Sequence, residues 1–468
     1  MPATDYLPLL AALIGEENVK LDMDTRTHAS RSWSPLYTKA KMAGNALVVD
    51  AVALPEDTEQ VTAVVRWANE HKALLVPVGG GSNIVGNGGA DSRSAGIVAL
   101  DLSRLQTIRL EEESLLVHVG AGYSLAALED QLNAHEYTLG FLPQSLHLAA
   151  VGGAVASNAI GLFSGRYGRQ RDITAGLEVV LPNGSIIRTS PAPGGNAAFD
   201  LHDLFIGSEG TLGVITEVAL RMRPIPEVRA WTAFTFTSFG DAVDALRLIY
   251  RSDARPAAIR LLDTEAAGAL LAGDIAATAS PLLLLAFEGD ELAQTGPYQI
   301  AYAVCQKVGG TAHPAEIGEK WFDEERSRTD WLAPNARPGG LADVFAVSAP
   351  WSAIKAVYAA ARAAVNPLVT HLDIQITHAY PTGAAVTCRF EAQAEPPTPE
   401  AAAELYGRIA AAVFSAIEAA GGSIAHHYGV GSTRRAFFQQ ERGPEATAAL
   451  RALKNAFDPN GVLPQPPA

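Results

Sequence analysis

The sequence predicts an α+β fold with two domains. Helix-like and strand-like apolar patterns are interleaved along the chain, without the regular strand–helix alternation of a doubly wound sheet. A glycine-rich texture fills the first half and fades after the proline pair Pro224 and Pro226, which is typical of a domain boundary. At 468 residues the chain has ample material for two or three domains. We therefore expect a helical lead-in over 1–45, a first domain over 46–226, a second over 227–424, and a loop with a C-terminal helix over 425–468.

The first domain opens with a strand, a helix and a second strand. Residues 48–49 and 51–53 are apolar and end before Pro55, as a buried strand would. Asp57 or Thr58 can cap the helix that follows, whose apolar residues repeat at helical spacing. Further along we expect a strand at 73–76, a strand at 97–102, a hairpin over 108–119 and a helix that starts near Ser124.

The second domain shows the same mixture of patterns. We expect strands at 233–236 and 281–287, and helices at 239–251 and 351–364. The last helix begins at Pro444 and stops at Asp458-Pro459-Asn460-Gly461.

The stretch Pro77-Val78-Gly79-Gly80-Gly81-Ser82-Asn83 follows the second strand. Successive glycines let a chain turn sharply, and a run of free N–H groups in such a turn forms a nest for an anion such as phosphate. A plain turn has the same composition. Because residues 84–90 continue as loop, a P-loop or dinucleotide turn is disfavoured, since both lead into a helix. Gly120-Ala121-Gly122 is a second near miss, because Leu125 stands where the third glycine of a dinucleotide fingerprint belongs.

Further motifs follow this loop in a fixed order, at 143–145, 150–161, 167–168, 177–184 and 207–216. Together they resemble the FAD-binding domain of the vanillyl-alcohol oxidase superfamily, which includes D-lactate and glycolate dehydrogenases and alkyldihydroxyacetonephosphate synthase. The resemblance covers essentially the whole chain. It implies an FAD-binding domain of two subdomains (PCMH type) and an α+β cap domain with an antiparallel sheet. It also implies that the C-terminal tail packs back on the FAD domain.

The resemblance assigns FAD to backbone-rich segments of the first domain. We expect noncovalent binding, because the glycine loop lacks the histidine of flavin-linked relatives. The expected cofactor-binding residues are Pro77, Val78, Gly79, Gly80, Gly81, Ser82, Asn83, Gln144, Ser145, Ala150, Gly152, Gly153, Ala156, Ser157, Asn158, Ala159, Glu209, Gly210, Thr211, Leu212, Gly213, Val214 and Ile215.

A histidine pair, His426-His427, precedes a Gly-x-Gly turn. Such a pair suits proton transfer or ligand contact, and it is equally typical of a solvent-exposed loop. The synthases carry three histidines here, and Tyr428 replaces the third in this chain. The 2-hydroxy acid dehydrogenases carry Glu-His-Gly, usually with a metal. Because this chain lacks that glutamate, we predict no metal site.

Tyr380 and Arg260 complete the expected catalytic set. Tyr380 matches the tyrosine that the synthase resemblance makes a proton donor or acceptor, although a strand-end tyrosine would look the same. To act as a base near neutrality it would need contact with the flavin or a positive neighbour, such as His378, His427 or Arg260. Arg260 matches a functionally important arginine of the synthases. An arginine in an apolar segment must be paired or bind an anion, and an ion pair with Asp263 is the structural alternative.

One residue that the synthase resemblance calls for is missing. Leu332 or Ala333 stands where the synthases place an arginine that holds substrate phosphate, while Arg328 and Arg337 are nearby but out of register. Ala346 likewise replaces an acidic residue of that family. A phosphorylated substrate is therefore in question.

Composition narrows the class of protein. The formal net charge of −15 and a pI near 5.2 disfavour a nucleic-acid partner. No apolar run is long enough to span a membrane, so we expect at most peripheral contact, and only if the substrate is a lipid. Cys305 and Cys388 are too few for a disulfide framework and are expected to be buried thiols. We expect a cytoplasmic homodimer that acts on a small molecule.

Three functional hypotheses follow. In the first, the enzyme exchanges an acyl for an alkoxy group through a flavin N5 adduct, as the synthase resemblance implies, with Tyr380 and His427 moving protons and Arg260 stabilising charge. In the second, it oxidises a 2-hydroxy acid or another hydroxylated molecule. In the third, it binds flavin without turnover.

Overall fold

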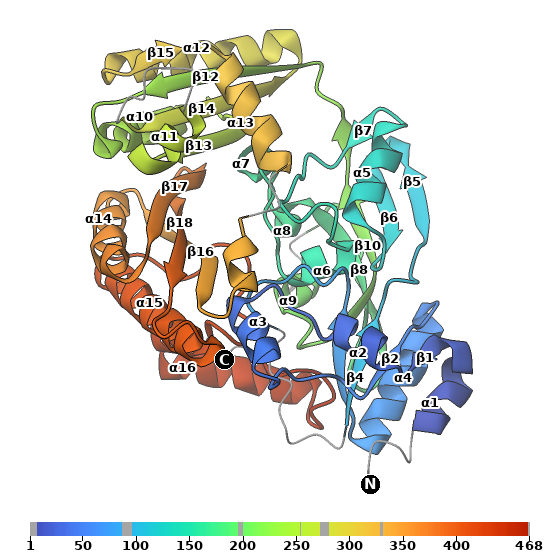
Figure 1. Cartoon of the computed structure of the whole chain (residues 1–468). Coiled ribbons are helices and arrows are strands. Elements are labelled where there is room, and N and C mark those ends of the chain that lie inside the picture. Colours follow the sequence, from blue (N-terminus) through green and yellow to red (C-terminus); the bar gives the residue numbers. More distant parts are fainter. Residues whose placement is uncertain are drawn as a thin grey trace.

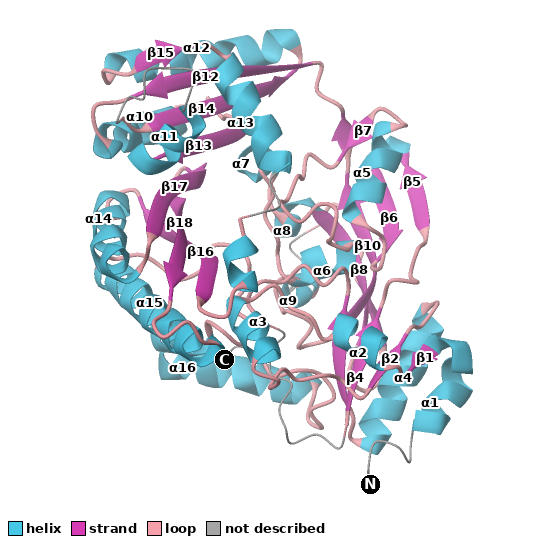
Figure 2. Ribbon diagram, in the orientation of Figure 1, coloured by secondary structure: helices cyan, strands magenta, loops and turns pink. Residues whose placement is uncertain are grey.

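A computed structural model describes residues 7–86, 96–194, 200–252, 254–271, 280–327 and 331–466. The fold is α+β, as predicted, and has two subdomains on one side and a larger helix-covered sheet on the other (Figures 1 and 2). The two sides face each other, and the last helix of the chain reaches back from the larger sheet toward the smaller ones.

The first subdomain is a small, mostly parallel sheet. Its strand order is β1 (Val19–Lys20), β2 (Ala51–Ala53), β4 (Ile97–Asp101) and β3 (Leu74–Val78), and only the β1–β2 pair is antiparallel. Asp57 caps helix α4 (Thr58–His71) by accepting a hydrogen bond from the N–H of Gln60, which decides between the two predicted caps. Three short helices precede the second strand: α1 (Leu7–Ile14), α2 (Met23–Ala29) and α3 (Pro35–Met42).

The second subdomain is an antiparallel sheet in the order β5 (Ile108–Glu111), β6 (Leu116–Gly120), β10 (Val214–Arg221), β8 (Thr174–Val180) and β9 (Ile186–Arg188). The predicted hairpin is confirmed as the β5–β6 pair. The predicted helix is α5 (Leu125–Asn133), capped by Ser124. The remaining elements are β7 (Tyr137–Thr138), α6 (Val151–Ala156), α7 (Ser164–Tyr167), α8 (Gln170–Ile173), α9 (His202–Phe205) and β11 (Arg223–Pro224).

The cap domain is built on one antiparallel sheet, as expected. Its strand order is β15 (Thr311–His313), β12 (Val228–Thr235), β14 (Leu282–Gly289), β13 (Ala258–Leu262), β17 (His371–Tyr380), β18 (Gly383–Gln393) and β16 (Gly340–Pro350). The largest apolar core lies between this sheet and its helices. The helices on this core are α10 (Phe239–Arg251), α12 (Glu291–Lys307), α14 (Ile354–Val365) and α15 (Pro399–Ala419), while α11 (Thr264–Leu271) and α13 (Glu316–Ser327) pack in a separate apolar core.

The C-terminal segment ties the two sides together. Helix α16 (Arg435–Phe457) is broken at Gly443, whose φ is 79°, so Pro444 opens its second part as predicted. Near its end the buried Lys454 ammonium donates to the backbone oxygens of Thr211 and Leu463. The N–H of Leu75 donates to Val462 O, so the tail packs on the first subdomain.

Both cysteines are buried free thiols, as predicted. Within the part of the chain that the structure describes, no helix is long and apolar enough to cross a membrane.

Candidate active site

A cavity of about 470 Å³ lies between the N-terminal subdomains and the cap domain. The N-terminal side contributes the glycine loop (residues 77–83) and parts of 142–162. The cap side contributes side chains of β13, β17 and β18, and the loop after α15 adds His427 and Tyr428. The two walls therefore differ in kind, since one is largely backbone and the other is largely side chains.

The glycine loop leaves strand β3 and forms one wall of this cavity. The N–H groups of Gly79, Gly80, Gly81 and Ser82 donate to no other described residue, so they are free to bind an anion. Gly81 has a φ of +64°, which favours glycine. Gly80 cannot carry a side chain, because a Cβ there would lie 1.5 Å from Leu148 O. A nest of free donors beside a long cavity fits the diphosphate of FAD.

Most of the expected cofactor residues lie on the same cavity. Gly152 packs so closely on Ala121 that a Cβ would lie 2.6 Å from the Ala121 Cβ. Asn158, Thr211, Leu212 and Val214 do not line it. The expected residues that do are Pro77, Val78, Gly79, Gly80, Gly81, Ser82, Asn83, Gln144, Ser145, Ala150, Gly152, Gly153, Ala156, Ser157, Ala159, Glu209, Gly210, Gly213 and Ile215.

Glu209 is half-buried on the cavity and holds the loop that follows His427. Its carboxylate accepts hydrogen bonds from the N–H of Val430 (2.7 Å) and of Gly431 (2.9 Å). Burial raises the pKa of Glu209 above its usual range, opposed by these two hydrogen bonds. The side chain thus fastens the loop after His427 to the N-terminal domain.

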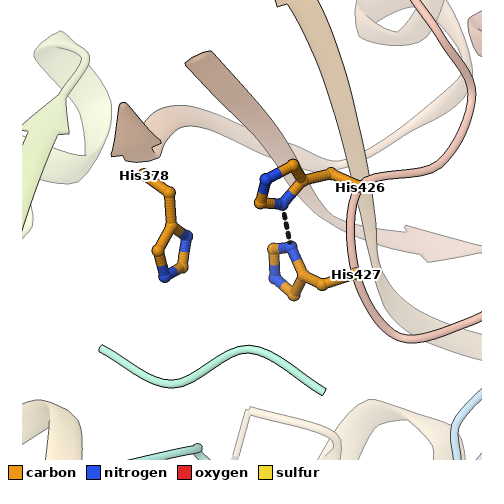
Figure 3. Close-up of side chains that lie close together, drawn as sticks. All are labelled: His378, His426 and His427. Atoms are coloured by element: carbon orange, nitrogen blue, oxygen red, sulfur yellow. Dashed lines mark hydrogen bonds between the residues drawn. The ribbon is translucent and has the colours of Figure 1, made fainter. Parts of the chain in front are cut away.

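His378, His426 and His427 lie close together, as Figure 3 shows, and His378 and His427 line the cavity. His378 comes from β17, and His426 and His427 come from the loop after α15. The Nδ1 atoms of His426 and His427 share a hydrogen bond of 2.8 Å. His378 Nε2 lies 3.0 Å from Gly161 O. One nitrogen atom of each ring lies within 4.8 Å of the others, a spacing that would also admit a metal ion.

Burial keeps these imidazoles neutral. It lowers the pKa of His378 to about 4, and it lowers the pKa of both His426 and His427 well below 6.5. Each ring also disfavours a charge on its neighbour, His378 on His426 and His426 on His427. A neutral imidazole keeps one ring nitrogen with a free lone pair, so His427, which lines the cavity, is able to accept a proton from a bound group.

Tyr380 lies at the outer end of this cluster. Its hydroxyl group is 3.0 Å from His426 Nε2, whereas neither Tyr380 nor His426 lines the cavity. The phenol contacts the neutral His426, and none of His378, His427 and Arg260 forms a hydrogen bond with it. Burial raises the pKa of Tyr380 to about 12, although the charge of Arg169 acts to lower it. Tyr380 therefore remains protonated near neutrality.

Arg260 projects from β13 onto the cavity. It is almost fully buried, and its nearest carboxylate is that of Glu325, with 3.8 Å from NH2 to Oε1. Its Nε has no hydrogen-bond partner, and its guanidinium carbon lies 4.8 Å from the centre of the Trp321 ring. The ion pair with Asp263 that the sequence allowed does not form.

Asp263 has a different role. It binds Arg362 at 2.6 Å and accepts a hydrogen bond from the N–H of Ile374. Arg260 is thereby left available for an anion in the cavity.

Sequence reasoning missed a polar face of the cap sheet. Gln375, Thr377, Thr387 and Arg389 all line the cavity with Arg260. Strand register explains the grouping, because Gln375 pairs with Thr387, and alternate residues of a strand share a face. Arg389 is held by Asp373, with 2.7 Å from Nε to Oδ2. The polar residues that alternate along β17 and β18 could have predicted this polar face from the sequence.

On the N-terminal side, Arg31, Trp33 and His147 also line the cavity and were missed. Arg31 and Trp33 lie in the lead-in, far along the chain from the glycine loop. No local pattern marks them as cavity residues.

The missing phosphate arginine is not replaced by a described neighbour. Leu332 lines the cavity, which makes this part of the wall apolar. Arg337 does not line it, and its carbonyl oxygen accepts a hydrogen bond from Lys39 Nζ. Arg328 lies outside the described residues.

Comparison with known proteins matches both halves of the chain. Residues 49–190 match the FAD binding domain, and residues 225–464 match the C-terminal domain of FAD linked oxidases. Alkyldihydroxyacetonephosphate synthase of Caenorhabditis elegans is 26% identical over 88% of this chain and 75% of the relative. The mitochondrial D-lactate dehydrogenase (cytochrome) of Arabidopsis thaliana is 29% identical over 96% and 77%. A solved alkyldihydroxyacetonephosphate synthase structure shares the fold, with a TM-score of 0.81, 21% identity, and coverage of 99% of this chain and 85% of that one.

Proposed function

The chain belongs to the FAD-linked oxidase family, and on that premise we propose that it oxidises a hydroxyl group of a small anionic molecule, in the manner of a 2-hydroxy acid dehydrogenase. FAD is its cofactor. When bound, FAD supplies the acceptor for the two electrons of such an oxidation. The glycine loop would hold its diphosphate, and we keep noncovalent binding as part of the proposal.

One observation supports this function above others, namely the polar cap wall. Arg260 is buried on the cavity, and its Nε has no partner. A substrate carboxylate would give that guanidinium the partner that its desolvation demands. Arg389, Gln375 and Thr377 offer further hydrogen bonds for hydroxyl groups.

The histidine cluster supports the proton side of the reaction. His427 Nε2 has no hydrogen-bond partner among the described residues, so it can take the hydroxyl proton. The proton on His427 Nδ1 then passes to His426 Nδ1. His426 in turn donates from Nε2 to the Tyr380 oxygen, which releases its own proton outward. Arg260 orients the anionic end of the substrate. After the transfer, the protons of His427, His426 and Tyr380 must move back to their original atoms before the next turnover.

The second candidate is acyl-for-alkoxy exchange, which is favoured by the sequence similarity to the nematode synthase and by the contact between Tyr380 and His426. The apolar Leu332, on the cavity where that reaction would call for a phosphate-binding arginine, weighs against it.

Anaerobic mixing of the holoenzyme with each substrate class tests the proposal. D-lactate, glycolate and larger 2-hydroxy acids should bleach the oxidised flavin band. An acylated ketone phosphate that perturbs the band without net reduction would support exchange and count against oxidation. If neither class changes the spectrum or binds, the proposal of a hydroxy acid oxidase is wrong.

A further inference from the structure

The lead-in segment before α3 covers the glycine loop. The N–H of Trp33 donates to Asn83 O at 2.9 Å, and Ser32 Oγ donates to Asn83 Oδ1 at 2.8 Å. Arg31 NH2 donates to Gly80 O at 3.1 Å. A segment fifty positions upstream in the chain is therefore fastened along one side of the nest.

Arg31 carries a charge that no residue described in the structure neutralises. Its side-chain hydrogen bonds to described residues go to Gly80 O and to His28 Nδ1, the latter at 3.2 Å, and neither partner is a carboxylate. A Cβ on Gly81 would lie 2.9 Å from Arg31 Nε, so the guanidinium lies directly against the glycine loop. The positive charge thus has no ionic partner among the described residues, and it lies beside N–H groups that donate to none of them.

Few positively charged side chains line the cavity, so the position of Arg31 matters for the binding of an anion. Arg31, Arg260 and Arg389 are the arginines on its described lining, no lysine lines it, and the latter two arginines belong to the cap. The chain as a whole carries a formal charge of −15, which opposes the binding of an anion. A nest of N–H groups supplies only partial charges, whereas a diphosphate carries two full ones.

We propose that Arg31 is a cofactor-binding residue that pairs with the diphosphate of FAD and closes the outer side of the nest. The guanidinium is held at the loop by Gly80 O and contacts His28 Nδ1, and its other N–H groups have no described partner, which leaves them for phosphate oxygens. The lead-in over residues 28–34 is then part of the flavin site rather than an appendage. This inference concerns the cofactor, so it does not depend on which substrate is oxidised.

Flavin binding to the stripped protein tests it without any turnover. Apoprotein of wild type, Arg31→Gln, Arg31→Lys and Arg26→Gln is titrated with FAD and with ADP, and binding is followed by quenching of flavin fluorescence and by calorimetry. Arg26 is the matched control, because it lies in the same segment and donates to Val49 O, but does not line the cavity.

Arg31→Gln should weaken FAD binding by about 10- to 100-fold, the range for losing a charge-assisted hydrogen bond to an anion. ADP, which shares the diphosphate, should weaken by the same factor, and the salt dependence of both affinities should decrease. Arg31→Lys should keep most of the affinity, and Arg26→Gln should keep all of it.

Three results would overturn the proposal: equal FAD affinity of Arg31→Gln and wild type, equal weakening by Arg26→Gln, or unchanged ADP affinity. If Arg31→Gln does not fold, Arg31→Lys decides, because loss of FAD binding in that charged variant would also contradict it.

Discussion

The two walls of the cavity differ in the groups that they present to a ligand, which are mainly backbone groups on one wall and side chains on the other. The N-terminal wall presents backbone N–H groups from one contiguous loop, residues 77–83, in which a Cβ is not tolerated at Gly80. The cap wall presents single side chains from three strands and a loop, such as Arg260, Thr377, Arg389 and His427. A site made of backbone N–H groups does not depend on side-chain identity, so a substitution can disrupt its binding but cannot alter its specificity. A side-chain site can change one residue at a time, and so it determines what reacts.

The largest effect should come from adding a side chain to the backbone wall. Gly80→Val should abolish FAD binding, because even its Cβ would meet Leu148 O at 1.5 Å. The reason is this close approach rather than a positive φ, which Gly81 has and Gly80 lacks. Flavin content of the purified protein is the measurement.

Gly407→Ala is the control for that substitution. Nothing lies within 4 Å of its Cβ, and the helix α15 should gain up to about 1 kcal/mol of stability with unchanged flavin content. Normal FAD content in Gly80→Val would show that the loop is not the diphosphate site.

On the side-chain wall, His427→Ala should keep FAD and lower turnover by about 10²- to 10⁴-fold, the usual scale for losing a general base. Tyr380→Phe should lower it by about 10²-fold, because it removes the outer end of the same proton path. The double variant should lose less than the product of the two single losses. Stopped-flow flavin reduction measures all three. Multiplicative losses would indicate separate roles, and full turnover by Tyr380→Phe would leave it a structural residue.

The same contrast explains what the sequence could predict. The glycine loop, the Asp57 and Ser124 caps and the break at Pro444 are local signals, and the structure agrees with them. Side-chain contacts between residues that are distant in the sequence could not be predicted from local patterns. Asp263 lies three positions after Arg260 but binds Arg362, and His426 rather than His427 touches Tyr380.

These pairs depend on strand register and on how the cap meets the N-terminal domain. Arg389 joins Arg260 on one face only once β17 lies between their strands. Arg31 reaches the glycine loop only when the lead-in folds across it. The alternation of polar residues along β17 and β18 marks a polar face, but nothing local in the sequence says that Arg260 or Arg31 meets the same cavity.

A smaller effect is expected where the cap wall holds the substrate rather than the proton. Arg260→Gln should raise KM for the oxidised acid by about 10- to 100-fold, because one charge-assisted contact is lost, with less effect on kcat. Arg362→Gln is the matched control, since that guanidinium binds Asp263 and does not line the cavity. Its variant should lose thermal stability and keep KM. An unchanged KM in Arg260→Gln would remove the anion from the proposed substrate.

The smallest expected effect is on the pH dependence of stability. Backbone N–H groups of the glycine loop do not titrate, whereas the buried imidazoles on the cap side do. Burial holds the pKa of His378 at about 4, and that of His426 well below 6.5, while an unfolded imidazole titrates near 6.5. As pH falls from 6.5 toward 4, the unfolded chain therefore binds more protons than the folded one, and the folded state loses stability. Each such imidazole contributes a slope of up to about 1.4 kcal/mol per pH unit in that window. Asp263 and Asp343 act in the opposite sense, because burial raises the pKa of each to about 6, so they favour the folded state as pH falls.

A comparison of wild type with a histidine variant separates the contribution of one imidazole to the free energy of unfolding from that of these carboxyl groups. Denaturant unfolding of wild type and His426→Gln, at several pH values between 7 and 5, should give curves that converge as pH falls, since the variant has one fewer imidazole to protonate on unfolding. Bound flavin should remain with the folded fraction at every pH, because the glycine loop offers only N–H groups. If His426→Gln ran parallel to wild type instead, His426 would be protonated in the folded state, and the neutral proton path that starts at His427 would be wrong.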